Sequence, residues 1–377
     1  MIYLDNSATT YPKPEMVKAA VMRGVSYLGA NPGRGSYPMA EAASAAVYEV
    51  RKKVASFFGA SGAENVIFTK SCTEALNQVL FGLLKSGDHV VISDIEHNAV
   101  LRPVKALEQK GVENTIFETF LGNSDQTTDS LRKALRGNTK LVVCTAASNV
   151  FGMRLPIRRL AALCRINGIS FCVDAAQAAG ILPFHMQEDE IDYLCIPSHK
   201  GLYGIMGAGI LVTDKGSSLT PLVYGGTGVN SQSPHQPEET PERLESGTLN
   251  VPGIMGMGAG LDFIARYGVE NIHRGELEKV SYLYERLQSC NGVILYTPYP
   301  QKEDFVPVLS FNVKNKGSEE VGSYLAGKGI AVRCGLHCAP LAHRKFGTED
   351  GTVRLSPSVF TTKENLAYFL RQIILYR

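Results

Sequence analysis

Five short polar clusters hold the side chains of this sequence that could do chemistry. They supply a lysine amine at Lys200, a carboxylate at Asp174, an imidazole at His97, side-chain amides, and a hydroxyl-rich segment at residues 71–73. A site for pyridoxal 5′-phosphate (PLP) needs these groups, because a lysine must form a Schiff base with the aldehyde and an anion must keep the pyridine nitrogen protonated. Residues 71–73, at the start of a helix, would offer N–H groups and hydroxyls to the phosphate. We therefore predict Lys200 for the Schiff base and Asp174 for the pyridine nitrogen.

Each polar cluster follows a short apolar run, as expected if the runs are buried strands. The runs are residues 66–68, 90–93, 141–144, 171–173 and 193–196. Amphipathic stretches such as residues 73–85 alternate with them, which predicts an α/β fold with helices covering a mostly parallel sheet. Ligands of open α/β sheets bind beyond the carboxyl ends of the strands, so the five clusters should gather at one edge. Taken alone, each cluster would be an ordinary polar loop.

The pattern changes near residue 250. There we predict the end of a large PLP-binding domain (14–250) and the start of a smaller α+β domain (251–377), with residues 1–13 packed on the small domain. In the second part, helical patterns cover residues 251–266 and 276–289, and strand-like runs cover residues 306–313, 330–333 and 352–355. A chain of 377 residues is long enough for one large domain or two coupled ones.

Composition and charge disfavour several classes of function. Lys plus Arg exceed Asp plus Glu by 38 − 36 = 2, and no dense basic cluster suggests a row of phosphate contacts, so we predict no nucleic-acid binding. No apolar run reaches the length of a membrane span and no signal-peptide pattern opens the sequence, so we expect no membrane association and a cytoplasmic location. Dinucleotide-binding and P-loop motifs are also missing from the sequence.

The eight cysteines are scattered through the chain, mostly inside apolar runs, which is not typical of a secreted disulfide framework. Metal-like spacing occurs only at Cys334, His337, Cys338 and His343. No second Cys-x-x-Cys pair completes a zinc site, so we predict no metal.

Eight collinear motifs extend almost from end to end of the chain: YLDNSA (3–8), TEALN (73–77), EHN (96–98), SNV (148–150), VDAAQ (173–177), SHK (198–200), ESGT (245–248) and RCGLHCA (333–339). Through them the sequence resembles the class V aminotransferase group of fold-type I PLP enzymes. Within that group it is most similar to the cysteine desulfurases and selenocysteine lyases of the SufS-like type.

The resemblance implies a role for each motif around the cofactor ring. Lys200 would carry the internal aldimine and Asp174 would pair with the pyridine nitrogen. His97 would stack on the ring face, and Gln177 would donate a hydrogen bond to the phenolic oxygen.

The resemblance also implies a phosphate site shared between two subunits. Thr73, Ser198, His199 and the backbone N–H of Cys72 would hold the phosphate, and Thr248 of a neighbouring subunit would complete the site. A homodimer with composite active sites follows from this.

For the substrate, the resemblance implies that Asn149 and Arg354 hold the α-carboxylate, since a guanidinium fork suits a planar carboxylate. The implied substrate is L-cysteine or L-selenocysteine. A sulfur-acceptor protein is a further expected partner.

Cys338 decides which reaction is expected. Residues 333–339 match the SufS-like R-x-G-x-H-C-A pattern at every fixed position, and a desulfurase needs a thiol to attack the sulfur of cysteine. We therefore expect L-cysteine to become L-alanine, with the sulfur held as a persulfide on Cys338. The thiol should react best as a thiolate beside a cation such as His337 or Arg333.

Four alternatives stay open at the level of sequence. The protein could be a selenocysteine lyase that uses the same residues, or a class V aminotransferase or β-lyase in which Cys338 is idle. It could also be a cofactor-binding scaffold without turnover. Cys338 itself could be a structural thiol.

Two segments depart from the SufS-like pattern. Residues 31–37 (NPGRGSY) stand where many such proteins carry a histidine-containing H-R-G-x-H segment, and residues 225–228 (GGTG) replace an arginine-bearing turn. These changes bear on the substrate more than on the cofactor. Cys334 is an additional thiol that could resolve a persulfide or fill space.

Overall fold

A computed structural model describes residues 1–376, and its largest sheet has the order β2-β8-β7-β6-β5-β3-β4. β8 is antiparallel to both of its neighbours, and the other strands run in one direction. All five predicted strands lie in this sheet, so the α/β prediction is confirmed. The strands are β2 (Val66–Thr69), β3 (His89–Ser93), β4 (Glu113–Phe117), β5 (Thr139–Thr145), β6 (Ser170–Asp174), β7 (Tyr193–Pro197) and β8 (Gly209–Val212).

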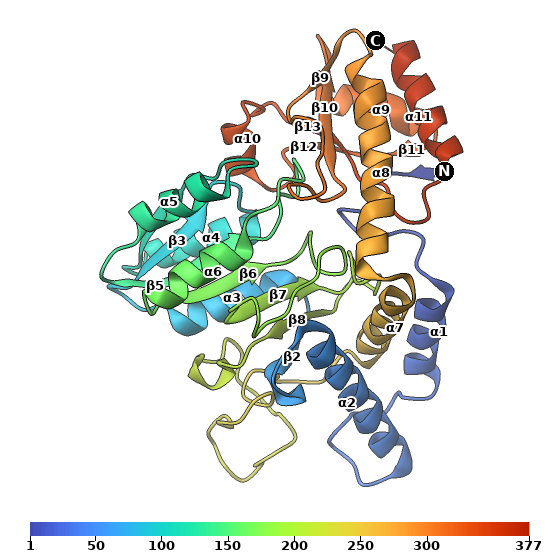
Figure 1. Cartoon of the computed structure of the whole chain (residues 1–377). Coiled ribbons are helices and arrows are strands. Elements are labelled where there is room, and N and C mark those ends of the chain that lie inside the picture. Colours follow the sequence, from blue (N-terminus) through green and yellow to red (C-terminus); the bar gives the residue numbers. More distant parts are fainter. Residues whose placement is uncertain (377) are drawn as a thin grey trace.

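Alternate residues of these strands enter two different hydrophobic clusters. Val90 and Ile92 pack with α3 and α4 on one face, whereas Val91 between them packs on the other face with α2, α5, α6 and α7. Side chains of a strand point to opposite faces in turn, so strands covered on both faces read as continuous apolar runs. Figure 1 shows the helices on both sides of the sheet: α2 (Pro38–Phe58), α3 (Cys72–Leu83), α4 (Asn98–Glu108), α5 (Ser124–Ala134), α6 (Ile157–Ile166) and α7 (Val251–Tyr267).

The second sheet has the order β12-β13-β10-β9 and is antiparallel. It lies at the opposite end of the molecule from α2 (Figure 1). Its strands and the helices of this part are β9 (Val293–Leu295), β10 (Leu309–Val313), β12 (Arg333–Gly335), β13 (Thr352–Leu355), α8 (Val269–Gln288), α9 (Ser318–Gly327), α10 (Pro340–Lys345) and α11 (Lys363–Tyr376).

Two predicted strands of this part need correction. The run 306–313 becomes a strand only from Leu309, because Pro307 has no N–H to donate to a ladder. The run 330–333 divides at Val332: β11 (Ile330–Ala331) pairs with β1 (Ile2–Tyr3), and β12 pairs with β13. The strand therefore changes partner, which periodicity alone does not show.

The helix α7 packs against α2 and against α1 (Glu15–Ser26), and its buried residues belong to the hydrophobic cluster of the large sheet. A Cβ at Gly260 would lie 1.9 Å from the carbonyl oxygen of Leu202, so only glycine lets α7 approach the turn after Lys200 this closely. The predicted division of the chain at residue 250 stays a prediction, and this packing associates α7 with the large part.

Two short 3-10 helices, Ala63–Asn65 and Gly216–Ser218, complete the elements. Within residues 1–376, no helix is both long enough and apolar enough to cross a membrane.

Candidate active site

Asp174, Cys72 and Lys200 meet at the carboxyl edge of the large sheet. Asp174 ends β6 and is buried; its Oδ1 accepts a hydrogen bond from the backbone N–H of Ala176 (2.9 Å) and faces the Cys72 thiol (3.5 Å). Burial lowers the pKa of Lys200, and the charge of nearby Asp174 opposes this shift. The sequence therefore places an amine with a depressed pKa next to a buried carboxylate, as a Schiff-base lysine requires.

His97 is the N-cap of α4, which follows β3 in the chain. Its Nδ1 accepts a hydrogen bond from the backbone N–H of Ala99 (3.0 Å). Burial lowers the pKa of His97, while Asp174 acts in the opposite direction. The ring is therefore neutral near pH 7 and carries its proton on Nε2.

The predicted phosphate ligands include the first residues of α3 and two buried polar atoms of the turn that follows β7. Ser71 caps this helix by accepting a hydrogen bond from the N–H of Glu74 (3.1 Å), and Cys72 and Thr73 are its first residues. Ser198 Oγ and His199 Nδ1 are buried and make no hydrogen bond within residues 1–376. Buried polar atoms are rarely left without partners, so these two atoms fit a site that a ligand completes.

Two of the predicted cofactor ligands are engaged elsewhere in this chain. Gln177 Nε2 donates a hydrogen bond to the carbonyl oxygen of Ser7 (3.0 Å). Thr248 is exposed, and within residues 1–376 its hydroxyl accepts one hydrogen bond, from Asn31 Nδ2 (3.4 Å). Within residues 1–376, Thr248 lines a cavity with Lys70 and Glu74, and no hydrogen bond joins its side chain to the first residues of α3.

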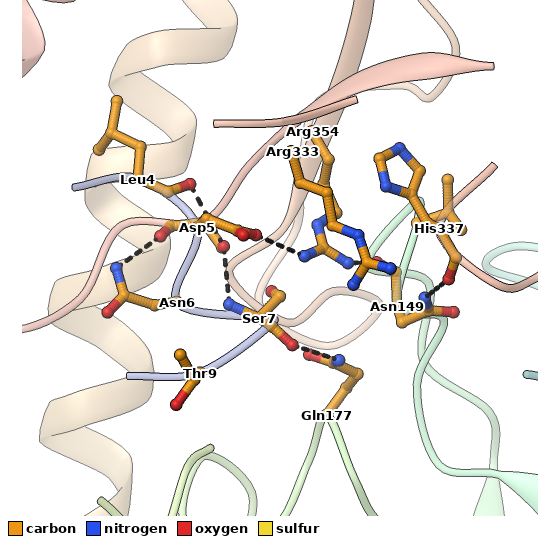
Figure 2. Close-up of polar contacts among 12 residues, drawn as sticks. Leu4, Asp5, Asn6, Ser7, Thr9, Asn149, Gln177, Arg333, His337 and Arg354 are labelled. Carbon is orange, nitrogen blue, oxygen red and sulfur yellow. Dashed lines mark hydrogen bonds and ion pairs between the residues drawn. The ribbon is translucent and has the colours of Figure 1, made fainter. Parts of the chain in front are cut away.

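Arg354 and Asn149, the predicted carboxylate ligands, are bonded to each other (Figure 2). Arg354 lies on β13 and is completely buried; its Nη1 donates to the carbonyl oxygen of Asn149 (2.9 Å) and its Nη2 to Asp5 Oδ1 (2.7 Å). Its Nε has no partner within residues 1–376. Asn149 Nδ2 donates to the carbonyl oxygen of His337 (2.8 Å), one residue before Cys338.

Cys338 is exposed on a turn in which it and His337 both have positive φ, 56° and 49°. Such backbone costs a non-glycine residue about 1–2 kcal/mol, so other contacts must hold the turn. The N–H of Ala339 closes it onto the carbonyl oxygen of Leu336 (3.0 Å), and the N–H of Asn98 donates to the carbonyl oxygen of Cys338 (2.7 Å).

Arg333 and His337 were both expected as cations beside Cys338, and only Arg333 remains a candidate for this role. Arg333 Nη2 lies 3.7 Å from Cys338 Sγ. Burial, with a smaller contribution from Arg354, lowers the pKa of His337 to about 2, and its Nε2 lies 3.1 Å from both oxygens of Thr352. His337 is therefore a neutral residue that holds the turn, and the expectation of a histidine cation is wrong.

A family model described as aminotransferase class V matches residues 2–369 of the sequence. The chain belongs to the class V aminotransferase family. Its relatives include a probable cysteine desulfurase of Methanothermobacter thermautotrophicus, 32% identical over 373 residues that cover 97% of this chain and 92% of that protein. A cysteine desulfurase of Pectobacterium atrosepticum is 31% identical over 376 residues, covering 97% and 90%.

Solved structures of cysteine desulfurases also align with this class V protein over nearly its whole length. The apo cysteine desulfurase of Thermococcus onnurineus aligns with a TM-score of 0.92 at 32% identity, covering 99% of this chain and 94% of that one. The Escherichia coli cysteine desulfurase CsdA aligns with a TM-score of 0.87 at 26% identity, covering 98% and 93%. The family and fold class inferred from the sequence are confirmed.

Sequence reasoning missed three contributors to the site of this class V enzyme. Asp5 lies in the first motif but had no expected role, and it pairs with Arg354. The N–H of Asn98 holds the Cys338 turn. Glu96 is completely buried, and its Oε1 accepts hydrogen bonds from the N–H of Thr145 (2.8 Å) and the hydroxyl of Ser93. Burial raises the pKa of Glu96 to about 8, so a neutral carboxyl joins the ends of β3 and β5.

The two segments that depart from the SufS-like pattern come together in space. Residues 33–36, 224–231 and 233–237 line one cavity of about 820 Å³, and Arg34 Nη2 donates to the carbonyl oxygen of Gly226 (2.6 Å). The two changes in the sequence are therefore parts of one local rearrangement.

Cys334 and the histidines near Cys338 do not form a metal site. Within residues 1–376, no group of three or more His, Cys, Asp or Glu side chains could hold a metal ion. Burial raises the pKa of Cys334 to about 11. A Cβ at Gly322 of α9 would lie 2.3 Å from its sulfur, so this thiol fills the contact between β12 and α9.

Proposed function

We propose that this protein is a PLP-dependent cysteine desulfurase, which converts L-cysteine to L-alanine and holds the sulfur as a persulfide on Cys338. The exposed Cys338 turn is the observation that carries the proposal. Its backbone is bonded to the start of α4 beside His97 and, through His337, to Asn149. Relatives named as cysteine desulfurases over nearly the whole chain support it.

The residues present fit PLP. Lys200 would hold its aldehyde and Asp174 its pyridine nitrogen, while Ser198 Oγ and His199 Nδ1 have free hydrogen-bonding capacity that the phosphate could use. We assign the backbone N–H of Cys72 and Thr73 to the same phosphate. When bound, PLP supplies an electron sink for bonds at the substrate's α-carbon.

The chain's own residues orient the substrate and accept its sulfur. Arg354 binds the α-carboxylate through its free Nε, and Asn149 supports it. The Cys338 thiolate attacks the substrate's sulfur: an S–S bond forms, the C–S bond breaks, and the electron pair goes to the β-carbon, which gains a proton and becomes the methyl group of L-alanine. His97 can give or take a proton at Nε2. Arg333, 3.7 Å away, pairs with the thiolate and then with the persulfide anion.

We also propose a homodimer in which Thr248 of one subunit completes the phosphate site of the other. Thr248 is exposed in the single chain, and Leu222 and Val223, which line the same cavity as Thr248, are exposed as well. Exposed apolar side chains of this kind favour burial against a partner, and a two-fold axis would place each Thr248 opposite the other subunit's site.

A protein acceptor and a cytoplasmic location complete the proposal. Cys338 is exposed, so an acceptor thiol can reach its persulfide from solvent. The nucleophile must stay reduced between turnovers, which the cytoplasm allows and an oxidising compartment does not.

The test is to incubate the purified, PLP-loaded protein with L-cysteine and, separately, with L-selenocysteine. Alanine, sulfide or selenide, and keto acids are quantified for each. Alanine and persulfide from cysteine are expected. A keto acid in place of alanine would favour an aminotransferase. Alanine from selenocysteine but not from cysteine would favour a selenocysteine lyase. No turnover of either substrate would favour a cofactor-binding scaffold.

A further inference from the structure

The guanidinium assigned to the substrate carboxylate already has an anionic partner. Asp5 Oδ1 accepts a hydrogen bond from Arg354 Nη2 at 2.7 Å, and Arg354 is completely buried, so the pair is largely out of water. A substrate carboxylate that approaches the free Nε therefore meets a cation whose charge is already balanced. Two carboxylates would then share one guanidinium, at a separation where they repel each other.

The backbone of Asp5 is held in place, because the N-terminal segment is fixed on both sides of it. Leu4 is buried in the core of the second sheet, and Asp5 forms a parallel bridge with Ser356. Asn6 Nδ2 donates to the carbonyl oxygen of Ser356 (2.8 Å), and the N–H of Ser7 donates to its hydroxyl (2.8 Å). Figure 2 shows Asp5 pointing at Arg354 from this segment.

Arg333 lies directly opposite Arg354 in the register of β12 and β13. Like charges in this position destabilise a sheet, so both are there for the site. Within residues 1–376 Arg333 makes no ion pair, and Asp5 is the carboxylate that pairs with Arg354. Arg333, Arg354 and Asp5 together carry a net charge of +1. The positive charge without a carboxylate partner is that of Arg333, which lies beside Cys338.

We propose that Asp5 is an internal competitor of the substrate's α-carboxylate at Arg354. It keeps the affinity for that carboxylate moderate, and this speeds the release of L-alanine, which carries the same carboxylate as L-cysteine. The inference rests on the proposed function, because it takes Arg354 as the carboxylate ligand and alanine as the product.

The test measures binding of L-alanine to the PLP-loaded protein through the change in visible absorbance. Asp5→Asn keeps a hydrogen-bond acceptor of the same shape and removes the charge. With an effective dielectric of about 20 and the two carboxylates about 5 Å apart across one guanidinium, removing the charge of Asp5 should tighten alanine binding on the order of 100-fold. The KM for cysteine should fall with it, and kcat should fall as product release slows. Asp5→Ser should also tighten alanine binding, and it replaces Asp5→Asn in the test if Asp5→Asn does not fold.

The matched control is Asp125→Asn, which removes a carboxylate from an exposed pair with Arg159 far from the site in sequence. It should bind L-alanine as the wild type does. Arg354→Gln should lose the binding.

A merely structural role of Asp5 would weaken alanine binding, so unchanged or weaker binding in a folded Asp5 variant overturns the proposal. Unchanged binding in Arg354→Gln overturns both this proposal and the carboxylate assignment. Suppose that Asp5→Asn binds alanine more tightly but the wild type makes no alanine from cysteine. The proposal that Asp5 competes for Arg354 would then stand, and the desulfurase function would be rejected.

Discussion

The backbone N–H of Asn98 donates a hydrogen bond of 2.7 Å to the carbonyl oxygen of Cys338. Asn98 follows His97, which caps α4, so the imidazole at the strand edge and the thiol of the second sheet have a fixed relation to each other. These two residues lie 240 positions apart in the sequence (338 − 98 = 240). The bond joins the two parts of the molecule at the place where chemistry is expected.

Lys200→Ala should abolish the visible absorbance of the PLP-loaded protein that borohydride reduction makes permanent in the wild type. The reason is that Lys200, with its pKa lowered by burial, is the amine beside Asp174. Mass spectrometry of a borohydride-treated digest locates the modified lysine. Lys70 is exposed at the end of β2, and Lys70→Ala should keep the absorbance. A modified peptide that contains Lys70 would reject the assignment.

Thr248→Ala should weaken PLP binding without dissociating the protein, because we place Thr248 in the phosphate site of the partner subunit. Loss of one hydrogen bond to a charged phosphate corresponds to roughly 10- to 100-fold in Kd. Equilibrium dialysis measures the Kd, and sedimentation measures the oligomeric state. Thr220→Ala, another exposed threonine, is the control. A monomer that holds PLP as tightly as the wild type would contradict the composite site.

The sequence was sufficient for five of the seven strands of the large sheet and for Asp174 at its edge, but β4 and β8 were not predicted. Strands buried on both faces must be apolar throughout, which made residues 90–93 and 141–144 recognisable, and Asp174 follows such a strand directly. Pro307 and Val332 show where periodicity fails, because the first removes a donor and the second separates two pairing partners.

Contacts between residues distant in sequence could not be predicted. Asp5 and Arg354 are 349 residues apart, and no local pattern joins them. The neutrality of His337 depends on its burial and on the nearby charge of Arg354, and the motif around Cys338 shows neither. The proposed role of Thr248 involves a second chain, so neither one sequence nor one subunit can show its partner.

Stability should fall on acidification partly through His337. Its pKa is about 2 in the folded protein and about 6.5 in an unfolded chain, so below pH ~6.5 only the unfolded state binds this proton. The stabilisation is complete above that pH and is lost as the pH falls toward 2. One such group accounts for about 2 kcal/mol of unfolding free energy between pH 6.5 and pH 5.

His337→Asn cannot gain this proton, so its unfolding free energy should fall less between pH 6.5 and pH 5 than that of the wild type. At pH 7 the variant should be less stable by about 1 kcal/mol or more, because the contact with Thr352 is lost. Urea unfolding at several pH values measures both effects. His235→Asn changes an exposed histidine and should follow the wild-type curve. An unchanged pH dependence in His337→Asn would show that His337 is not held neutral.

Cys338→Ala should separate sulfur chemistry from selenium chemistry. Sulfur leaves the β-carbon of cysteine reluctantly, so removal of the attacking thiol should lower alanine formation from cysteine on the order of 10²-fold or more. Selenium has the weaker bond to carbon, so it can depart as elemental selenium while the electron pair of the C–Se bond stays on the β-carbon, which takes a proton. Alanine formation from selenocysteine should therefore largely persist without the thiol. Persulfide should disappear from the protein in the same variant, which mass spectrometry of the intact chain detects.

Cys334→Ala is the matched control, since it removes a thiol four residues away whose pKa burial raises to about 11 and which packs against α9. It should keep activity on both substrates. If Cys338→Ala consumed cysteine as fast as the wild type, Cys338 would be an idle thiol, and a keto acid as the product would favour a β-lyase or aminotransferase over the desulfurase. Loss of both activities in Cys338→Ala would instead mean that the turn itself, held by Asn98 and His337, is needed to close the site.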